Sequence, residues 1–418
     1  MMRSLFAGVS GLRNHQIRMD VIGNNIANVN TIGFKGSRVL FRDVLYQTLA
    51  GASAPTGTRG GTNPMQVGLG VALAAIDTIH TAGSFQSTGV DTDMAVEGDG
   101  FFVVSDGLRQ YYTRAGAFTV DDEGNLVAAN GMRVLGWTAD PRTGAINTQT
   151  AVAPIVIRRG AELAPSATTE AVFGGNIDAS SPVGTTFTVP KAIYDSQGNV
   201  RQLEIVFTKT AVNTWSWVAH CYHDPATGTD DHVTAGSGTL VFYPDGRLDP
   251  DTDGAGPDTG STGTGWTYDP ATGRASATVT IVSNSGVNNW GVNDLSVRID
   301  FTDLTQFAAE TSATAVSQNG YTRGTLQAFQ VDSRGVITGS FSNGRNQALA
   351  QVALALFTNP AGLTRAGNTL FEESNNSGEV QIGTAGNGGR GLIKPSNLEM
   401  SNVDLSQEFT EMIITQRG

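Results

Sequence analysis

Three acidic residues stand at alternate positions in one loop-forming segment, and their spacing matches the opening of a calcium-binding loop. Asp249, Asp251 and Asp253 precede Gly254, an arrangement that lets one cation collect several carboxylate oxygens. Gly260 occupies the position where the bidentate glutamate is needed, and the flanking residues favour strand and turn rather than helix. We therefore interpret the segment as a solvated acidic loop, with adventitious calcium binding as the alternative.

A second group of possible ligands surrounds the single cysteine of the chain. His220, Cys221 and His223 lie close together, and His232 follows after a predicted turn. On a strand Cys221 and His223 share one face, so a three-ligand zinc site is geometrically conceivable. The spacing matches no standard zinc pattern, and half-buried strand residues explain it as well. A reactive thiol is a further alternative, but we favour a small buried or edge residue.

The glycine-rich segment 386–391 has the spacing of a dinucleotide-binding loop but not its context. Lys394 and Pro395 follow where a helix should begin, so the loop does not open the expected strand–loop–helix unit. No nucleophile elbow, zinc-protease motif or kinase signature is present. The sequence thus predicts no catalytic residues, no metal and no cofactor, and we expect a protein that is not an enzyme.

Composition points to a β-rich protein of more than one domain. The chain has 418 residues, 52 of them Gly, and only 15% are charged, which suits a turn-rich β protein. Residues 1–48 hold six Lys and Arg against two Asp and Glu, whereas residues 150–320 hold eight against eighteen. The acidic middle argues against nucleic-acid binding. No segment is apolar enough to span a bilayer, and the start of the chain does not match a cleaved signal peptide.

The first 35 residues predict an amphipathic helix that ends in an asparagine-rich segment. Apolar residues recur at seven-residue spacing with two more one turn away, which is typical of a helix that packs against other helices. We call these residues the α-helical stripe: Leu5, Val9, Leu12, Met19, Ile22 and Ile26. Asparagine and glycine then predict a helix end that opens into an ordered loop. The residues concerned are Asn24, Asn25, Asn28, Asn30, Gly33 and Phe34.

The other end of the chain carries a matching pattern. Leu398, Leu405 and Met412 repeat every seven residues with Phe409 between them, which predicts a second amphipathic helix. Two such helices at opposite ends of one chain need a partner surface, either each other or neighbouring subunits. We predict self-assembly contacts at the α-helical stripe and at four C-terminal residues: Leu405, Phe409, Met412 and Ile413.

These two ends resemble the conserved ends of the flagellar rod and hook proteins, the axial family of the bacterial flagellum. The match runs through residues 8–12 and the asparagine segment, and again through residues 401–418. Residues 63–70, 96–103 and 304–307 resemble the hook branch of the family in particular. In that family the terminal helix continues well past the final Gln416, so we expect this sequence to be truncated there.

The chain is expected to be mainly β with terminal α-helices, built from discontinuous, nested β domains of barrel or sandwich type. Asp–Gly turns recur at residues 122–126, 195–200, 244–248 and 332–336, and each predicts a hairpin. Strands are predicted at 203–207 and 215–218. The predicted segments are a helix and family signature at 1–35, an extended linker at 36–70, a discontinuous β domain at 71–148 with 321–395, an inserted outer β domain at 149–320, and a C-terminal helix at 396–418.

The resemblance implies a structural subunit of the flagellar hook that self-assembles into a flexible helical tube. That tube joins rod to filament and transmits torque. The implied partners are copies of the same chain, rod proteins, hook–filament junction proteins and the hook cap during assembly, with neither nucleic acid nor membrane insertion. The implied location is the extracellular hook, reached through the flagellar export apparatus without a cleaved signal. Another axial component such as the distal rod is the nearer alternative, and a secreted β-rich adhesin or enzyme is the remote one.

Overall fold

The structure is a computed structural model that describes residues 2–55, 59–222, 232–250, 261–269, 271–281, 284–285, 288–289 and 292–417. It separates into two compact units. Unit 1 comprises residues 1–161, 326–340 and 346–418, and unit 2 comprises residues 162–325 and 341–345. Most of the regular structure is β, with a helix at each end of the chain, which confirms the predicted fold class. No described helix combines the length and the apolar character needed to cross a membrane.

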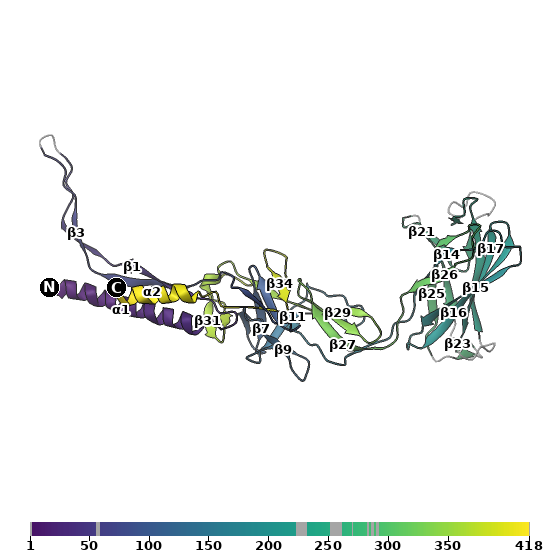
Figure 1. Ribbon diagram of the computed structural model, residues 1–418, viewed down its shortest axis with the longest axis horizontal. Helices are drawn as coiled ribbons and strands as arrows, with labels where there is room; N and C mark the ends of the chain where they lie inside the picture. Colours follow the sequence, from purple (N-terminus) through teal and green to yellow (C-terminus); the bar gives the residue numbers. More distant parts are fainter. Residues whose placement is uncertain are drawn as a thin grey trace. The chain divides into compact units, whose positions relative to one another are not determined.

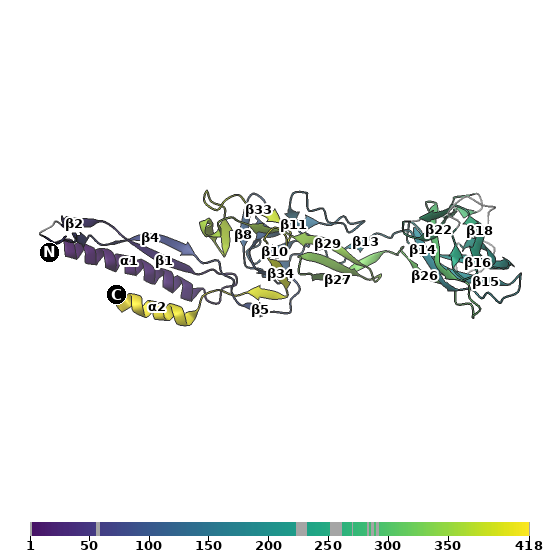
Figure 2. The same ribbon diagram turned by 90° about the horizontal axis from the view of Figure 1, so that it is seen from above.

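Helices and long hairpins form one part of unit 1. Helix α1 (Met2–Ala27) lies beside α2 (Leu405–Arg417), as both views show (Figures 1 and 2). Strand β1 (Ser37–Asp43) pairs antiparallel with β4 (Val71–Thr78), and both contact α1. Strand β2 (Tyr46–Ala50) pairs with β3 (Met65–Gly68). Residues 36–70, predicted as an extended linker, therefore contain three paired strands.

A larger sheet forms the rest of unit 1 and joins residues from both halves of the chain. Its central order is β28-β29-β11-β7-β8-β32-β31. The strands are β7 (Phe101–Ser105), β8 (Gln110–Thr113), β9 (Phe118–Val120), β10 (Leu126–Ala128), β11 (Arg133–Thr138), β12 (Ala153–Pro154), β27 (Gly324–Val331), β28 (Val336–Phe341), β29 (Asn346–Val352), β30 (Leu354–Leu356), β31 (Thr364–Gly367), β32 (Leu370–Glu372) and β33 (Gln381–Gly383), with a 3-10 helix at Pro360–Gly362.

Two short strand pairs tie the late chain to the early chain within unit 1. Strand β5 (Phe85–Ser87) pairs with β35 (Asn397–Glu399), and β6 (Met94–Glu97) pairs with β34 (Leu392–Pro395). The nearby core of the large sheet is aromatic and aliphatic, and it includes Phe101, Tyr112, Trp137, Phe357 and Phe371. Residues 149–161 also belong to unit 1, whereas the sequence analysis places them in the insertion.

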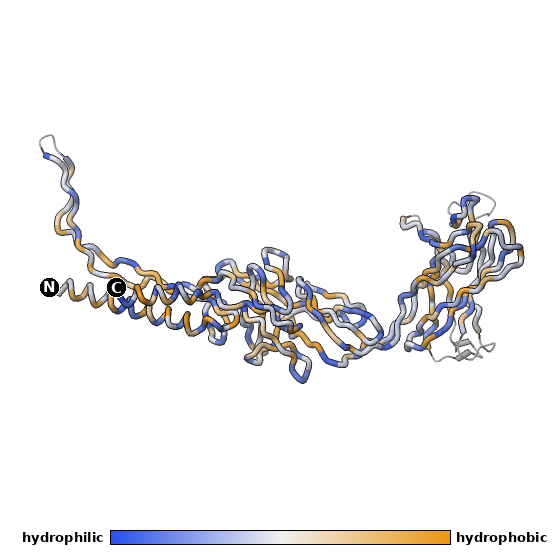
Figure 3. The backbone as a smooth tube through the Cα atoms, viewed as in Figure 1, coloured by the Kyte–Doolittle hydropathy of each residue, from blue (hydrophilic) through white to orange (hydrophobic). Residues whose placement is uncertain are grey.

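Unit 2 is a sandwich of two sheets around one core. Alternate residues of its longest strands are buried, as at Leu203, Ile205 and Phe207, because successive side chains of a strand point to opposite faces. The core joins Trp215 and Trp217 of one sheet to aromatic residues of the other, and Figure 3 shows the recurrent apolar positions along these strands. The predicted strands at 203–207 and 215–218 are confirmed.

The two sheets of unit 2 differ in topology. The five-stranded sheet has the order β21-β22-β25-β14-β26 and contains one parallel pair, β14 with β25. The six-stranded sheet has the order β15-β16-β17-β18-β19, with β20 on β18. The strands of these two sheets are β14 (Glu170–Asn176), β15 (Thr186–Tyr194), β16 (Val200–Ala211), β17 (Thr214–Tyr222), β18 (His232–Phe242), β19 (Leu248–Asp249), β20 (Thr262–Gly263), β21 (Trp266–Asp269), β22 (Arg274–Ile281), β25 (Leu295–Thr305) and β26 (Thr314–Gln318). Strand β13 (Glu162–Leu163) pairs with β27, and β23 (Asn284–Ser285) pairs with β24 (Asn288–Asn289) outside the sandwich.

The four predicted Asp–Gly turns are present. Gly124, Gly198, Gly246 and Gly335 all have positive φ, between 74° and 89°, a conformation that costs glycine little. In three of the turns the glycine N–H donates to the carbonyl of the aspartate three residues earlier, Asp121, Asp195 or Asp332, and Gly246 donates to Tyr243 in the same way. The turn residues alone thus specified these chain reversals.

Candidate assembly surface and the junction of the chain ends

Two pairs of polar side chains join α1 to α2. Arg18 forms an ion pair with Glu411, and the Asn25 side chain donates to Glu408 Oε1 at 3.0 Å. Burial raises the pKa of Glu408, and the Asn25 hydrogen bond opposes that rise. The two ends therefore recognise each other through hydrogen bonds and charge, and most apolar side chains of both helices are left uncovered.

The α-helical stripe is divided by this arrangement. Leu5, Val9 and Leu12 are 60% to 75% exposed, and Met19 is 38% exposed. Ile22 is buried and Ile26 is half-buried. On α2 the pattern is the same, because Leu405, Phe409 and Ile413 are exposed whereas Met412 is half-buried. Seven of the ten predicted contact residues are thus exposed, to an extent that ranges from 38% at Met19 to 75% at Leu12.

A second apolar surface lies on the hairpin of β2 and β3, which we call the ribbon (residues 44–69). Every residue of the two strands except Ala50 is exposed. The large apolar side chains concerned are Leu45, Tyr46, Leu49, Met65 and Val67. This surface was not predicted, because the Gly and Pro residues of segment 51–64 indicate a loop, although apolar residues recur on both sides of them. An isolated hairpin of this kind is marginal in water, so the ribbon needs a partner.

Hydrogen bonds of the asparagine segment fix the path of the chain where it leaves α1. Asn25 is buried, and its side chain both accepts from Ser37 N–H at 3.0 Å and donates to Ser37 O at 2.8 Å. Asn28 donates to Asn24 O, and Thr31 donates to Asn28 Oδ1. Asn30 is exposed. The predicted helix end is confirmed, since α1 stops at Ala27 and the following residues form hydrogen-bonded turns.

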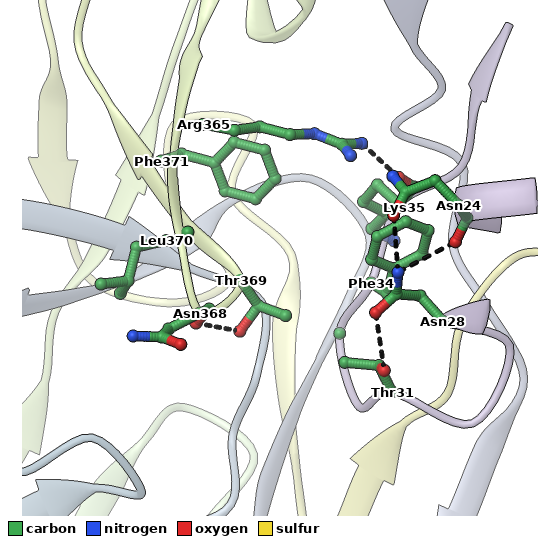
Figure 4. A pocket seen from close by; sticks show the side chains of 12 residues that line it. Asn24, Asn28, Thr31, Phe34, Lys35, Arg365, Asn368, Thr369, Leu370 and Phe371 are labelled. Atoms are coloured by element: carbon green, nitrogen blue, oxygen red, sulfur yellow. Dashed lines mark hydrogen bonds between the residues drawn. The ribbon is translucent and has the colours of Figure 1, made fainter. Parts of the chain in front are cut away.

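Gly33 and Phe34 fix the end of the asparagine segment against the rest of unit 1. Gly33 allows a close approach of two backbones, and Phe34 packs under a guanidinium group. Gly33 has φ +69°, and a Cβ at that position would lie 2.5 Å from Ala115 N, so a larger residue does not fit. Its N–H donates to Glu399 O at 2.8 Å. Phe34 is buried beneath the Arg365 guanidinium, 5.2 Å from its ring centroid. Figure 4 shows Arg365 reaching across to this segment, where it donates to the carbonyl of Lys35.

A hollow of about 430 Å³ separates the asparagine segment from the turn between β31 and β32. Asn24, Asn28 and Thr31 line one side, whereas Leu370 and Phe371 line the other (Figure 4). The hollow is part polar and part apolar. Its position beside the signature residues identifies the family segment as a packing junction within unit 1.

Three buried charged groups join the two ends of the chain behind this hollow. Lys35 Nζ lies 2.6 Å from Glu399 Oε1, and Arg114 lies 3.5 Å from the other carboxylate oxygen. All three side chains are at most 3% exposed. Lys35 also donates to Thr81 O at 2.8 Å, and Gly83 N–H donates to Glu399. We call Lys35, Arg114 and Glu399 the charge triad.

Sequence reasoning missed the charge triad. Lys35 closes the asparagine segment, but nothing local marks Glu399 or Arg114 as its partner. Burial is the main influence on Lys35 and Arg114, and it lowers the pKa of each, whereas the Glu399 carboxylate opposes that change.

The metal and nucleotide candidates do not form sites among the described residues. No group of three or more His, Cys, Asp or Glu is arranged to hold a metal there. Cys221 is buried in β17, and burial raises its thiol pKa to about 12. His223 and the segment 251–254 fall outside the described residues. Segment 386–391 is a turn between β33 and β34, so the helix that a dinucleotide loop requires is absent from that position.

A mostly β chain whose two ends form a helix pair with exposed apolar side chains has the architecture of an axial structural protein. Family comparisons agree over four regions. Residues 5–35 match the flagella basal body rod protein family, residues 95–168 the flagellar hook protein FlgE/F/G D1 domain, residues 162–321 the flagellar basal body protein FlaE D2 domain, and residues 394–418 the flagellar basal body rod FlgEFG protein C-terminal family.

Relatives that align over the whole chain identify the branch of the axial proteins to which it is similar. The chain is 41% identical to the flagellar hook protein FlgE of Treponema pallidum and 42% identical to that of Borreliella burgdorferi. Each alignment covers 100% of this chain and 95% of the relative. The fold is similar to that of the Helicobacter pylori flagellar hook protein FlgE2, with a TM-score of 0.52 at 16% identity over 75% of this chain and 100% of that one. The chain belongs to the flagellar hook protein family, and it is a structural subunit of the hook rather than an enzyme.

Proposed function

We propose that copies of this chain assemble into the helical tube of the hook through the helix pair and the ribbon. The tube would join rod to filament, transmit torque and bend. Its other partners would be rod proteins, hook–filament junction proteins and the hook cap. The subunit would reach its extracellular position through the flagellar export apparatus without a cleaved signal.

The uncovered apolar side chains of the helix pair carry this proposal. They come from both ends of the chain, and the polar contact between α1 and α2 leaves them exposed. A large uncovered apolar patch on a single subunit is typical of a protein interface. One subunit presents this patch to a different surface of the next in a head-to-tail contact, and such contacts generate open helical polymers unless the rotation closes.

The helix pair and unit 2 differ in surface character, which supports different roles for them in the polymer. Residues 150–320 carry a net charge of −10, and many of their large apolar residues lie in the sandwich core of unit 2. We infer that unit 2 faces outward and that its hydrated surface permits small displacements between subunits. The outer part of the subunit in this proposal is unit 2, residues 162–325 with 341–345, and the inner β part consists of the remaining residues between 71 and 395.

The test is a pair of matched substitutions that each place a glutamate on an exposed apolar residue. Leu12→Glu alters the helix pair, where Leu12 is 75% exposed, and Val212→Glu alters a turn of unit 2, where Val212 is 81% exposed. Neither side chain is buried, so both variants should fold with near-normal stability. Each is mixed with fragments of assembled hook, and polymer growth is followed by sedimentation and negative-stain electron microscopy.

We expect Leu12→Glu to weaken addition to the fragments by about tenfold to a hundredfold, because burying one leucine is worth about 1.5–3 kcal/mol. Val212→Glu should grow like the unaltered chain. Equal growth of both variants would show that the helix pair is not the assembly surface.

A further inference from the structure

One histidine lies in the junction of the chain ends, in a setting that holds it neutral. His80 follows β4, and its ring packs edge-on against Phe101 and tilted against Phe371, with centroid distances of 5.7 and 5.5 Å. Both ring nitrogens are buried, and within the described part of the chain neither makes a hydrogen bond of normal geometry, although the Pro360 carbonyl lies close enough to act on the ring. In its neutral form the ring therefore packs between Phe101 and Phe371 as an aromatic side chain would.

The charged groups around His80 are predominantly cations. Lys35 approaches from the asparagine segment, Arg114 from the end of β8, and Arg365 from β31. The carboxylate in this cluster is Glu399 of β35, which is already shared by Lys35 and Arg114. Asp99 acts on Arg114 from farther along the chain. A proton on His80 would add a fourth positive charge, and the described residues offer no carboxylate that offsets the charges of Lys35, Arg114 and Arg365 at the ring.

The segments that meet at this cluster also hold the two helices in place. Gly36 N–H donates to Asn402 Oδ1 at 2.8 Å, and Met400 N–H donates to Ser84 O at 2.9 Å. These bonds join three stretches of chain, which we call the junction segments: 28–36 after α1, 79–84 containing His80, and 397–402 before α2. Separation of these segments would release the start of α2 and the end of α1 together.

We propose that protonation of His80 separates the junction segments from one another. Acidification would then free both helices from the β part of unit 1. The neutral ring completes the aromatic packing, whereas the protonated ring repels Lys35, Arg114 and Arg365. The consequence for assembly rests on the proposed function, because it matters only if the helices form the polymer contact. The release itself is a property of the single subunit.

The direction of the pH dependence follows from the histidine itself. Burial, and then the charges of Lys35, Arg114 and Arg365, lower the pKa of His80 from 6.5 to about 4, although the Pro360 carbonyl partly offsets this. The unfolded chain therefore binds a proton that the folded junction excludes. The contribution of His80 to stability is present above about pH 6.5 and is lost as the pH falls towards about 4.

The experiment is hydrogen exchange by mass spectrometry on the full chain at about pH 7, 5.5 and 4, corrected for the intrinsic pH dependence of exchange. His80→Phe keeps an aromatic ring between Phe101 and Phe371 but removes the titrating group, and His80→Gln is a smaller second variant. His15→Phe is the matched control, because His15 also packs edge-on against an aromatic ring, that of Phe41 at 5.8 Å. Peptides from 203–221 in the core of unit 2 serve as the internal reference.

We expect exchange in the junction segments to rise about a hundredfold between pH 7 and 4 in the unaltered chain and in His15→Phe. In the His80 variants the rise should be less than about tenfold. The same rise in all chains, or full protection of the junction segments at about pH 4, would overturn the proposal. Loss of hook polymerisation at every pH, with the His80-dependent release intact, would instead count against the assembly function alone.

Discussion

Replacing Glu399 by glutamine should destabilise unit 1 far more than replacing its partner Lys35 by methionine. The Glu399 carboxylate is fully buried and accepts from Lys35 and Gly83, with Arg114 on its other oxygen. Without it, Lys35 and Arg114 remain buried as cations beside each other. Without Lys35, by contrast, Glu399 keeps Arg114 and the Gly83 N–H.

The magnitude follows from which charges are left unbalanced. Removing one partner of a buried ion pair costs about 3–5 kcal/mol, because the other charge stays desolvated. We expect Glu399→Gln to lie at the upper part of that range and Lys35→Met to cost about 1–3 kcal/mol, the loss typical of a hydrogen bond to a charged group that leaves its partner otherwise satisfied. The double variant Lys35→Met/Glu399→Gln should cost about 1–2 kcal/mol less than the sum of the two single effects, because Arg114 is then the one buried cation that lacks its carboxylate.

The measurement is urea unfolding read by hydrogen exchange in peptides from 94–105, which lie in β6 and β7 of unit 1. Peptides from 203–221 report unit 2 in the same sample and should not change in any variant. If Glu399→Gln and Lys35→Met cost the same, or if both cost less than about 1 kcal/mol, then Glu399 is not the shared counter-charge of Lys35 and Arg114.

Two further predictions concern single buried residues. Ile22→Ala should reduce the protection of α1 amides by about 2–4 kcal/mol, because Ile22 is buried at 4% exposure. Leu12→Ala, at a residue that is 75% exposed, should change it by less than about 0.5 kcal/mol. Native-state hydrogen exchange compares the two, and equal effects would contradict the assigned helix orientation. Cys221 should resist alkylation at neutral pH in the folded chain, because burial raises its thiol pKa to about 12 and thiolate is the reactive form. Iodoacetamide labelling followed by mass spectrometry checks this, with the urea-unfolded chain as the positive control, and rapid native labelling would show that the thiol is accessible.

Local sequence features predicted much of the fold. The seven-residue apolar spacing identified both helices, and the Asp–Gly segments identified turns whose glycines do have positive φ. Alternating apolar residues located β16 and β17 in the core of unit 2. These features are readable because helix, strand and turn preferences depend on residues within a few positions of one another.

Contacts between distant residues were not predictable in the same way. The sequence analysis treats residues 36–70 as a linker, whereas the structure pairs β1 with β4 and β2 with β3. It also treats all ten apolar positions of the helices as equivalent, whereas packing buries Ile22 and leaves Leu12 exposed. Periodicity specifies which residues share a helix face, but it does not specify which part of that face another element covers.

The sequence by itself determined a mainly β chain with an amphipathic helix at each end, hairpins at the Asp–Gly turns, and membership of the axial class through the two terminal signatures. Only the tertiary structure decided that the helices meet through Arg18, Asn25 and their carboxylate partners, so that the apolar faces stay free. It alone also brought Lys35 and Glu399 together across 364 positions of sequence. The physical reason is that a buried charge takes its partner from whichever segment the fold places beside it, and no local pattern encodes that neighbour.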